Sequence, residues 1–249
     1  MPERFVTLYG RMPVLEALVD ERAKVDRVLV ARNAQGEAID RIVDAAARRG
    51  LRVERTDPHR ITRLSGNGRH DQGVVVQVSA PGLEELDEWL AARADASLCV
   101  IVLDGLTNPA NVGMIIRTAV AAGLDGIVLP RAGSPDVGPL VVKASAGVAL
   151  FAPVLRAETS REATGRLRNA GVSLVGLSSS APTSIWDAGI DARTAFVLGN
   201  ETLGVSPAVA DIVSSWASVP LRGGVESLNV AAAATVVAFE VARRRALAR

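Results

Sequence analysis

The sequence predicts an α/β protein whose larger part is a parallel sheet with flanking helices. Short apolar runs at 98–103 and 173–177 have the length and composition of strands that are buried on both faces. Helical segments at 110–122 and 160–170 lie between them, and each of these segments ends at a glycine. Strands and helices that alternate in this way form a parallel sheet with crossover helices. Further strands are expected at 127–130, 153–155 and 195–198, a short helix at 139–146, and a long Ala/Val-rich helix at 230–245.

The first 80 residues predict a separate, smaller α/β unit. A strand at 26–31, a helix at 37–49 and a strand at 51–55 follow one another. Asp57-Pro58 has the residue types of a helix N-cap followed by proline at the first helical position. A short apolar strand is expected at 74–78.

Ala80-Pro81-Gly82 interrupts the pattern, and an acidic amphipathic helix is expected at 83–94. We therefore expect one domain at 1–80, a linker helix at 81–96 and a second domain at 97–249.

Composition limits the classes of function. The chain has 249 residues with 49% hydrophobic and 22% charged residues, which is typical of a globular protein. It shows no signal peptide and no apolar run long enough to span a membrane, so a cytoplasmic protein is expected. Cys99 is the only cysteine, and His59 and His70 are the only histidines, so we expect neither a disulfide nor a metal site.

Three groups of polar residues follow the ends of predicted strands. Asn111 and Arg117 lie six residues apart in the helix that follows the strand at 98–103. Glu201 lies in the loop after 195–198, and Ser227 and Asn229 precede the last helix. Ligands of open α/β sheets bind outside the carboxyl ends of the strands, where such loops meet. The G-x-G-x-x-G and P-loop patterns are missing, which argues against a dinucleotide cofactor and against a nucleoside triphosphatase. No histidine lies near Ser227 in the sequence, which argues against a serine hydrolase.

The three groups together resemble the ordered motifs of the SpoU/TrmH RNA ribose methyltransferases. The resemblance rests on Asn108-Pro109-x-Asn111-x-Gly113-x-x-x-Arg117, then Gly199-x-Glu201-x-x-Gly204, then Val219-Pro220 with Ser227-Leu228-Asn229-Val230. It covers nearly all of residues 98–245. Tyr9-Gly10-Arg11-x-Pro13 and Gln72-Gly73 are similar to the L30e-like substrate-binding domain that precedes the catalytic domain in this family. Many relatives carry a histidine directly before the Gln-Gly pair, where this chain has Asp71.

The resemblance implies methyl transfer from S-adenosylmethionine to a ribose 2′-hydroxyl of RNA, with 23S rRNA as the expected substrate. It implies a C-terminal trefoil knot and a homodimer with the site at its interface. The cofactor is expected at loops that begin at Leu177, Gly199 and Val219, with Leu228 packed on it. The resemblance assigns the catalytic site to Asn111, Arg117, Glu201, Ser227 and Asn229.

Arg117 is poorly suited to act as the catalytic base, because a guanidinium with a pKa above about 12 rarely gives up its proton. We therefore expect Arg117 to orient the RNA and to stabilise negative charge on the 2′-oxygen, rather than to act as the base. Methylation of tRNA, or of an rRNA site targeted by an antibiotic, is the alternative within this chemistry. An RNA-binding protein without catalysis is the alternative from another class, and the intact set of motif residues weighs against it.

Overall fold

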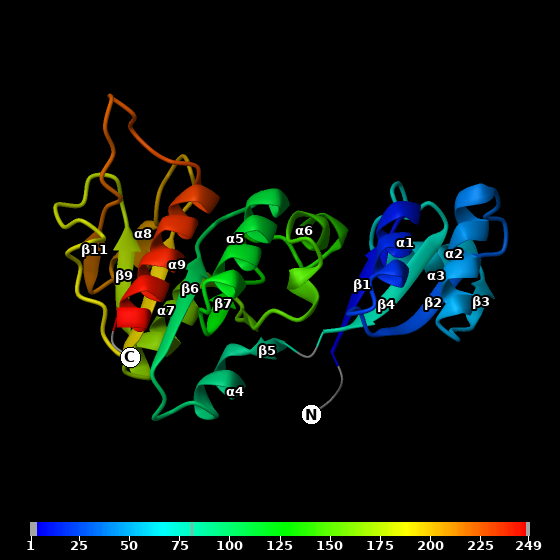
Figure 1. Ribbon diagram of the computed structural model, residues 1–249, viewed down its shortest axis with the longest axis horizontal. Coiled ribbons are helices and arrows are strands. Elements are labelled where there is room, and N and C mark those ends of the chain that lie inside the picture. The colour runs from blue at the N-terminus through cyan, green and yellow to red at the C-terminus, as the bar shows by residue number, and fades with distance from the viewer. Residues whose placement is uncertain (1–3, 81, 248–249) are drawn as a thin grey trace. The chain divides into compact units, whose positions relative to one another are not determined.

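The computed structural model describes residues 4–80 and 82–247 of the chain (Figure 1). The chain divides into two compact units. The first comprises the described part of Met1–Pro81 together with Val137–Phe151, and the second comprises Gly82–Asp136 and the described part of Ala152–Arg249. The chain therefore leaves the second unit after Asp136 and returns to it at Ala152, which a division of the sequence at residue 97 does not capture. The ends of the expected domains at residue 1, Pro81 and residue 249 lie outside the described residues.

The first unit contains a four-stranded mixed sheet with the strand order β1-β4-β2-β3. Strand β4 pairs antiparallel with β1 and β2, whereas β2 and β3 are parallel. The Asp57 side chain accepts a hydrogen bond of 2.8 Å from the His59 amide, which confirms the predicted N-cap of α3. The elements are β1 (Phe5–Tyr9), α1 (Arg11–Val19), β2 (Val25–Ala31), α2 (Glu37–Arg48), β3 (Val53–Thr56), α3 (Pro58–Ser65) and β4 (Val74–Ser79), joined by α6 (Pro139–Ala144) and η1 (Val148–Leu150).

The second unit contains the predicted parallel sheet, with seven strands in the order β11-β9-β10-β6-β7-β8-β5. Each neighbouring pair is parallel, which confirms the predicted fold class. The central strand β6 is buried along its whole length, as its continuous apolar run requires. The strands are β5 (Leu83–Glu85), β6 (Leu98–Leu103), β7 (Gly126–Val128), β8 (Val154–Arg156), β9 (Ser173–Leu177), β10 (Arg193–Leu198) and β11 (Ser215–Ala217).

Helices cover both faces of this sheet. Val100 and Val102 of β6 belong to one core with Trp89 of α4 and Leu167 of α7. Because side chains alternate along a strand, Cys99, Ile101 and Leu103 face the opposite side, where α5 and α9 lie side by side (Figure 1). The helices of this unit are α4 (Leu86–Ala91), α5 (Pro109–Ala121), α7 (Ser160–Asn169), α8 (Pro207–Ala210) and α9 (Val230–Leu247).

The prediction of a linker helix at 81–96 was wrong in part. Only Leu86–Ala91 is helical, and Leu83–Glu85 forms the edge strand β5, which pairs with β8. Leu86 and Trp89 are fully buried in the core of the second unit. The acidic pattern therefore reflects one exposed face of a packed segment, and this segment belongs to the sheet domain rather than to a connection between domains.

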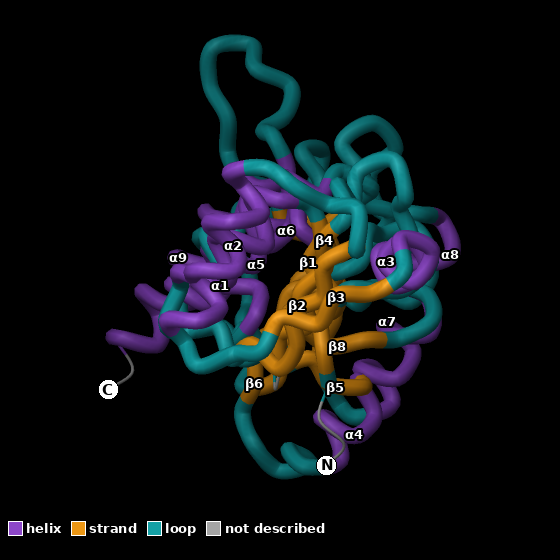
Figure 2. Tube along the Cα trace, turned by 90° about the vertical axis from the view of Figure 1, so that its right-hand side faces the viewer, coloured by secondary structure: helices purple, strands orange, loops and turns teal. Residues whose placement is uncertain are grey.

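The parallel pairing brings the carboxyl ends of β6, β9, β10 and β11 to one edge of the sheet. The loops at this edge are held together by side chains. The Asp104 carboxylate, which is buried, accepts hydrogen bonds from the Ser160 hydroxyl at 2.5 Å and from the Ser206 amide at 2.7 Å. Asn200 donates to the carbonyl of Gly105 at 3.1 Å. Loops from distant parts of the sequence are thus held together at this edge, and in Figure 2 loops (teal) extend above the strands (orange). No helix within 4–80 and 82–247 is long and apolar enough to cross a membrane.

Candidate active site

A cavity of about 430 Å³ opens at the carboxyl edge of the second sheet. The loops that follow β9, β10 and β11 surround it, together with the beginning of α9. All four residues predicted to bind the cofactor line this cavity, namely Leu177, Gly199, Val219 and Leu228. Glu201 and Ser227 of the predicted catalytic set line it as well. Its volume lies in the range of small-molecule sites, roughly 300–1,000 Å³.

The loop after β10 requires glycine at position 199. A Cβ atom on Gly199 would lie 2.0 Å from the carbonyl carbon of Gly204 and 2.1 Å from the amide nitrogen of Val205. The loop turns back on itself through hydrogen bonds between the backbones of Asn200 and Gly204, at 3.0 and 2.8 Å. A side chain at position 199 would therefore push the loop open, and only glycine permits this close approach of two backbone segments.

The cavity contains an aromatic side chain that the sequence motifs did not indicate. Trp216 of β11 lines the cavity and pairs in register with Gly176 of β9. A Cβ atom on Gly176 would lie 2.6 Å from the Trp216 ring, so the ring covers the strand at a position that has no side chain of its own. A tryptophan that precedes the Val219-Pro220 motif was visible in the sequence, but the pairing of β9 with β11 was not.

Asn111, Glu201 and Asn229 form one hydrogen-bonded cluster beside the cavity. The Asn111 side-chain amide donates to the Glu201 carboxylate, and the Asn229 amide donates to the Asn111 side-chain carbonyl at 3.2 Å. The side-chain carbonyl of Asn229 in turn accepts a hydrogen bond of 2.9 Å from the Ala231 backbone amide and so caps the start of α9. Three elements, α5, the loop after β10 and the start of α9, are thereby fixed to one another. Asn111 is only 5% exposed, so this arrangement is set by the interior of the fold.

Arg117 stands apart from this cluster. It is exposed on α5 and makes no hydrogen bond or ion pair with any residue that the structure describes. Successive helical residues are rotated by roughly 100°, so a side chain six positions after Asn111 points about 120° away from it. The structure thus brings Asn111, Glu201, Ser227 and Asn229 to the cavity but does not bring Arg117 into contact with them. The catalytic roles of all five residues stay predictions.

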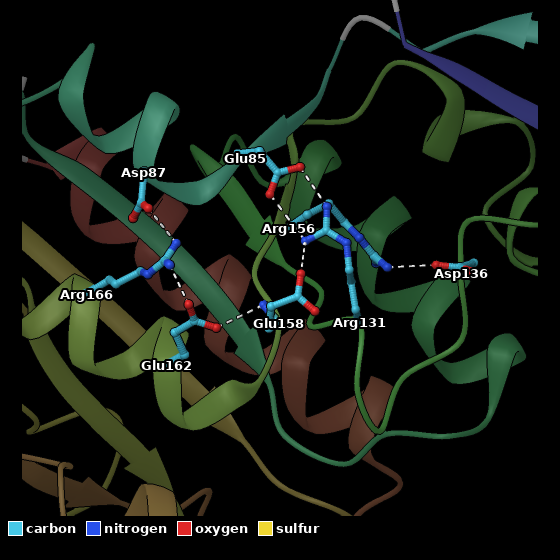
Figure 3. Close-up of polar contacts among 8 residues, drawn as sticks. All are labelled: Glu85, Asp87, Arg131, Asp136, Arg156, Glu158, Glu162 and Arg166. Carbon is cyan, nitrogen blue, oxygen red and sulfur yellow. Dashed lines mark hydrogen bonds and ion pairs between the residues drawn. The ribbon is translucent and has the colours of Figure 1, made fainter.

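A second group of charged residues continues along the same sheet edge, beyond β7 (Figure 3). Arg131 pairs with Glu85 at 2.7 Å and with Glu158 at 3.2 Å, and the hydrogen bond that Arg131 donates to Glu85 raises the pKa of Arg131. Arg156, whose side chain is 7% exposed, pairs with Asp136 at 2.7 Å. Burial lowers the pKa of Arg156. Because these arginines already face carboxylates of their own chain, this group braces the loops and is poorly suited to bind an anion. In the described chain, no three His, Cys, Asp or Glu side chains gather as metal ligands would.

Comparison with known proteins gives two family matches. Residues 98–239 match the SpoU rRNA Methylase family, and residues 7–83 match the family described as RNA 2′-O ribose methyltransferase substrate binding. An uncharacterized tRNA/rRNA methyltransferase of Mycolicibacterium smegmatis is 36% identical over 95% of this chain and 76% of that protein. The 23S rRNA (guanosine-2′-O-)-methyltransferase RlmB of Xanthomonas axonopodis pv. citri is 31% identical over 96% of each chain. The SpoU methyltransferase AviRb of Streptomyces viridochromogenes, in complex with AdoMet, superposes with a TM-score of 0.67 at 26% identity, over 98% of this chain and 91% of that one.

Proposed function

The chain belongs to the SpoU family of S-adenosylmethionine-dependent RNA 2′-O-ribose methyltransferases, and we propose that its substrate is 23S rRNA. The observation that carries this proposal is the extent of the likeness to the 23S rRNA enzyme, which runs through both the substrate-binding and the catalytic parts of the chain. A ribosomal substrate would place the reaction in the cytoplasm.

The cavity at the carboxyl edge suits S-adenosylmethionine. Leu177, Leu198, Trp216 and Leu228 supply apolar surface, while the backbone of the Gly199 loop and the Ser178 hydroxyl supply polar groups. Pockets with mostly apolar walls and a few placed polar groups are typical of cofactor sites. When bound, S-adenosylmethionine supplies an activated methyl group on a positively charged sulfur. We assign the binding role to the loops at Leu177, Gly199 and Val219, with Leu228 against the cofactor, in a C-terminal segment that forms the trefoil knot of this family.

The chain's own residues must then position and activate the ribose. A 2′-hydroxyl is neutral at pH 7 and is a weak nucleophile, so the site has to stabilise charge as it develops on the oxygen. Arg117 supplies a fixed positive charge for this purpose and can hold a neighbouring phosphate through its planar fork of donors. Asn111 and Asn229 hold the Glu201 carboxylate in place beside the cavity, and Ser227 presents its hydroxyl at the rim. Alignment of the reacting groups contributes roughly 7–11 kcal/mol in favourable cases.

We further infer a homodimer, because Arg117 finds no partner within its own described chain. The packed helices α5 and α9 each leave a large apolar side chain in solvent, with Met114 42% exposed and Phe239 50% exposed. Met114 lies three residues before Arg117 and therefore on the same side of α5. A second copy packed on this surface would cover the apolar side chains and surround Arg117 with groups of both subunits and of the RNA.

The test is methyl transfer to defined RNAs. Unmodified 23S rRNA made by transcription and bulk tRNA are each incubated with the protein and labelled S-adenosylmethionine, and the methylated ribose is then mapped. We expect one 2′-O-methyl group in 23S rRNA and none above background in tRNA. Methylation of tRNA alone would replace the proposed substrate by the alternative one, and transfer to neither RNA would reject the proposal. The Gly199→Ala variant is the control for the cofactor site and should lose S-adenosylmethionine binding in calorimetry.

A further inference from the structure

The first unit carries a second cavity, of about 660 Å³, at the carboxyl ends of its parallel strands β2 and β3. Its walls come from the end of β2, the loop after it, the start of α3 and the loop before β4. Open α/β sheets bind ligands at this edge. The residues that matter for its chemistry are Arg11, Asn33, Asp71 and Gln72.

Arg11 brings an uncompensated positive charge to this cavity. Its guanidinium lies against Gly36, where a Cβ atom would be 3.9 Å from the Arg11 Nη1 atom. The Arg11 side chain has no hydrogen bond or ion pair with the described residues. This contrasts with Arg131, whose charge is balanced by two carboxylates.

Asp71, the one carboxylate among the lining residues, is occupied by its own loop. It is 6% exposed and accepts hydrogen bonds from the Gly73 amide at 2.9 Å and from the Thr62 hydroxyl at 3.1 Å. Asp71 therefore shapes the loop before β4. Both of its oxygens are engaged by donors of this loop and of α3.

Two carboxamides complete the rim. The Gln72 side-chain carbonyl accepts a hydrogen bond of 2.8 Å from the Arg11 amide, which leaves its NH2 group without a partner in the described chain. Gln72 holds this position in a left-handed conformation, with φ of 52°. Asn33 is exposed, and its side chain makes no hydrogen bond with the described residues.

The surroundings of the cavity carry charges of both signs. Arg32 and Arg69 are exposed and adjoin lining residues in sequence. The acidic neighbours are Glu37 and Asp57, and Asp57 is engaged in capping α3. Residues 1–80 as a whole carry 14 Lys+Arg against 11 Asp+Glu.

We propose that this cavity binds one nucleotide of the RNA substrate, with Arg11 on a backbone phosphate and Asn33 and Gln72 on the edge of an unstacked base. Arginine suits the phosphate, and carboxamides pair with base edges through one donor and one acceptor. Single-stranded elements with accessible bases are what RNA-binding modules recognise in sequence-specific complexes. None of the residues that line the cavity is aromatic, so recognition here is by hydrogen bonds rather than by stacking. The inference rests on the proposed function, because it takes the bound nucleic acid to be the RNA that the enzyme methylates.

The test compares RNA binding by the full-length protein and three variants, with transcribed 23S rRNA and bulk tRNA as the probes and salt concentration as the variable. Arg11→Gln should weaken binding about tenfold and lower the slope of log K against log salt by on the order of one, because one phosphate contact is lost. Asn33→Ala should weaken binding on the order of tenfold without a change of slope. Arg52→Gln is the matched control, because it removes the same charge from an exposed residue before β3, at the opposite end of that strand. Thermal unfolding and S-adenosylmethionine affinity check that each variant is folded.

The outcomes distinguish a failure of the cavity inference from a failure of the proposed substrate. Unchanged affinity and slope in Arg11→Gln and Asn33→Ala, with a wild-type protein that methylates 23S rRNA, would overturn the cavity inference alone. An equal loss in Arg52→Gln would also overturn it, because the effect would then reflect net charge. If the wild-type protein binds only tRNA and Arg11→Gln weakens that binding, the cavity inference stands and the 23S rRNA assignment fails. A wild-type protein that binds neither RNA would overturn both.

Discussion

Asn111 and Arg117 lie on the same helix, α5, in opposite surroundings. Asn111 is buried and is hydrogen-bonded at both ends of its carboxamide, to Glu201 and to Asn229. Arg117 is exposed and has no partner among the described residues. The cluster around Asn111 is thus complete before any ligand arrives, whereas the arginine depends on RNA or on a second subunit for its partners. Loss of Arg117 should therefore affect catalysis alone, whereas loss of Asn111 should also affect stability.

The largest expected effect comes from Arg117→Ala. If Arg117 stabilises charge on the 2′-oxygen, turnover should fall by on the order of 10²-fold or more, which is about 2.7 kcal/mol of barrier. Because the side chain is exposed and unpaired within the described chain, the melting temperature and the affinity for S-adenosylmethionine should stay unchanged. Single-turnover methyl transfer and thermal unfolding on the same samples measure both quantities.

Arg117→Lys is the control for the geometry of the charge, and it should restore little activity because an ammonium lacks the planar fork of donors. If Arg117→Ala transferred the methyl group at a near-normal rate but unfolded at a lower temperature, the role of Arg117 would be structural and not catalytic.

Asn111→Ala, unlike Arg117→Ala, should destabilise the fold. It leaves the Glu201 carboxylate without its amide donor and the Asn229 amide without its acceptor. Both partners are exposed to water, and a hydrogen bond contributes about 0.5–1.5 kcal/mol net, so the loss of two bonds should lower the free energy of unfolding by about 2 kcal/mol. Urea unfolding measures this loss. Asn169→Ala, the same change at an exposed residue of α7, is the matched control. A stable Asn111→Ala protein would show that the cluster contributes little to the fold.

The sequence predicted those parts of the molecule that local chemistry determines. The apolar run Leu98–Leu103, the proline after Asp57 and the glycines that end helices each specify a strand, a cap or a helix end. The strand β5 was missed because two of its three residues are glutamates, which an edge strand can carry. The return of Val137–Phe151 to the first unit was missed because no local signal marks a chain that leaves a domain and comes back.

The site was predictable as a set of residues but not as an arrangement. Motif resemblance indicated Asn111 and Glu201, yet the contact between them spans 90 positions of sequence and depends on the parallel pairing of β6 with β10. The orientation of Arg117 follows from helical phase only once the direction of Asn111 is known. Trp216 was missed because its place in the cavity depends on its pairing with Gly176.

The smallest of the three expected effects is that of replacing Glu240. Unlike Arg117, Glu240 forms ion pairs within its own chain, with Arg243 and Arg244. Glu240 lies on α9, which packs against α5, and its side chain is 2% exposed. Hydrogen bonds from Arg243 and Arg244 lower the pKa of Glu240 from 4.5 to about 2. A carboxyl whose pKa is lower in the folded protein stabilises the fold fully above about pH 4.5, and this stabilisation is lost as the pH falls from about 4.5 to about 2.

Glu240→Gln should therefore lower the free energy of unfolding at pH 7 by roughly 1–2 kcal/mol, less than the full pKa shift implies, because Arg243 is 57% exposed and solvent screens that pair. The difference from the wild-type protein should shrink as the pH falls below about 4.5, since the wild-type carboxylate is then progressively protonated. Urea unfolding across this pH range measures the difference, and Glu158→Gln, in an ion pair with 70% exposure of the carboxylate, is the matched control. Because Arg244 also donates to the carbonyls of Ile185 and Ala188, a constant deficit at every pH would mean that Glu240 acts by packing, or by holding Arg244 on that loop, rather than by its charge.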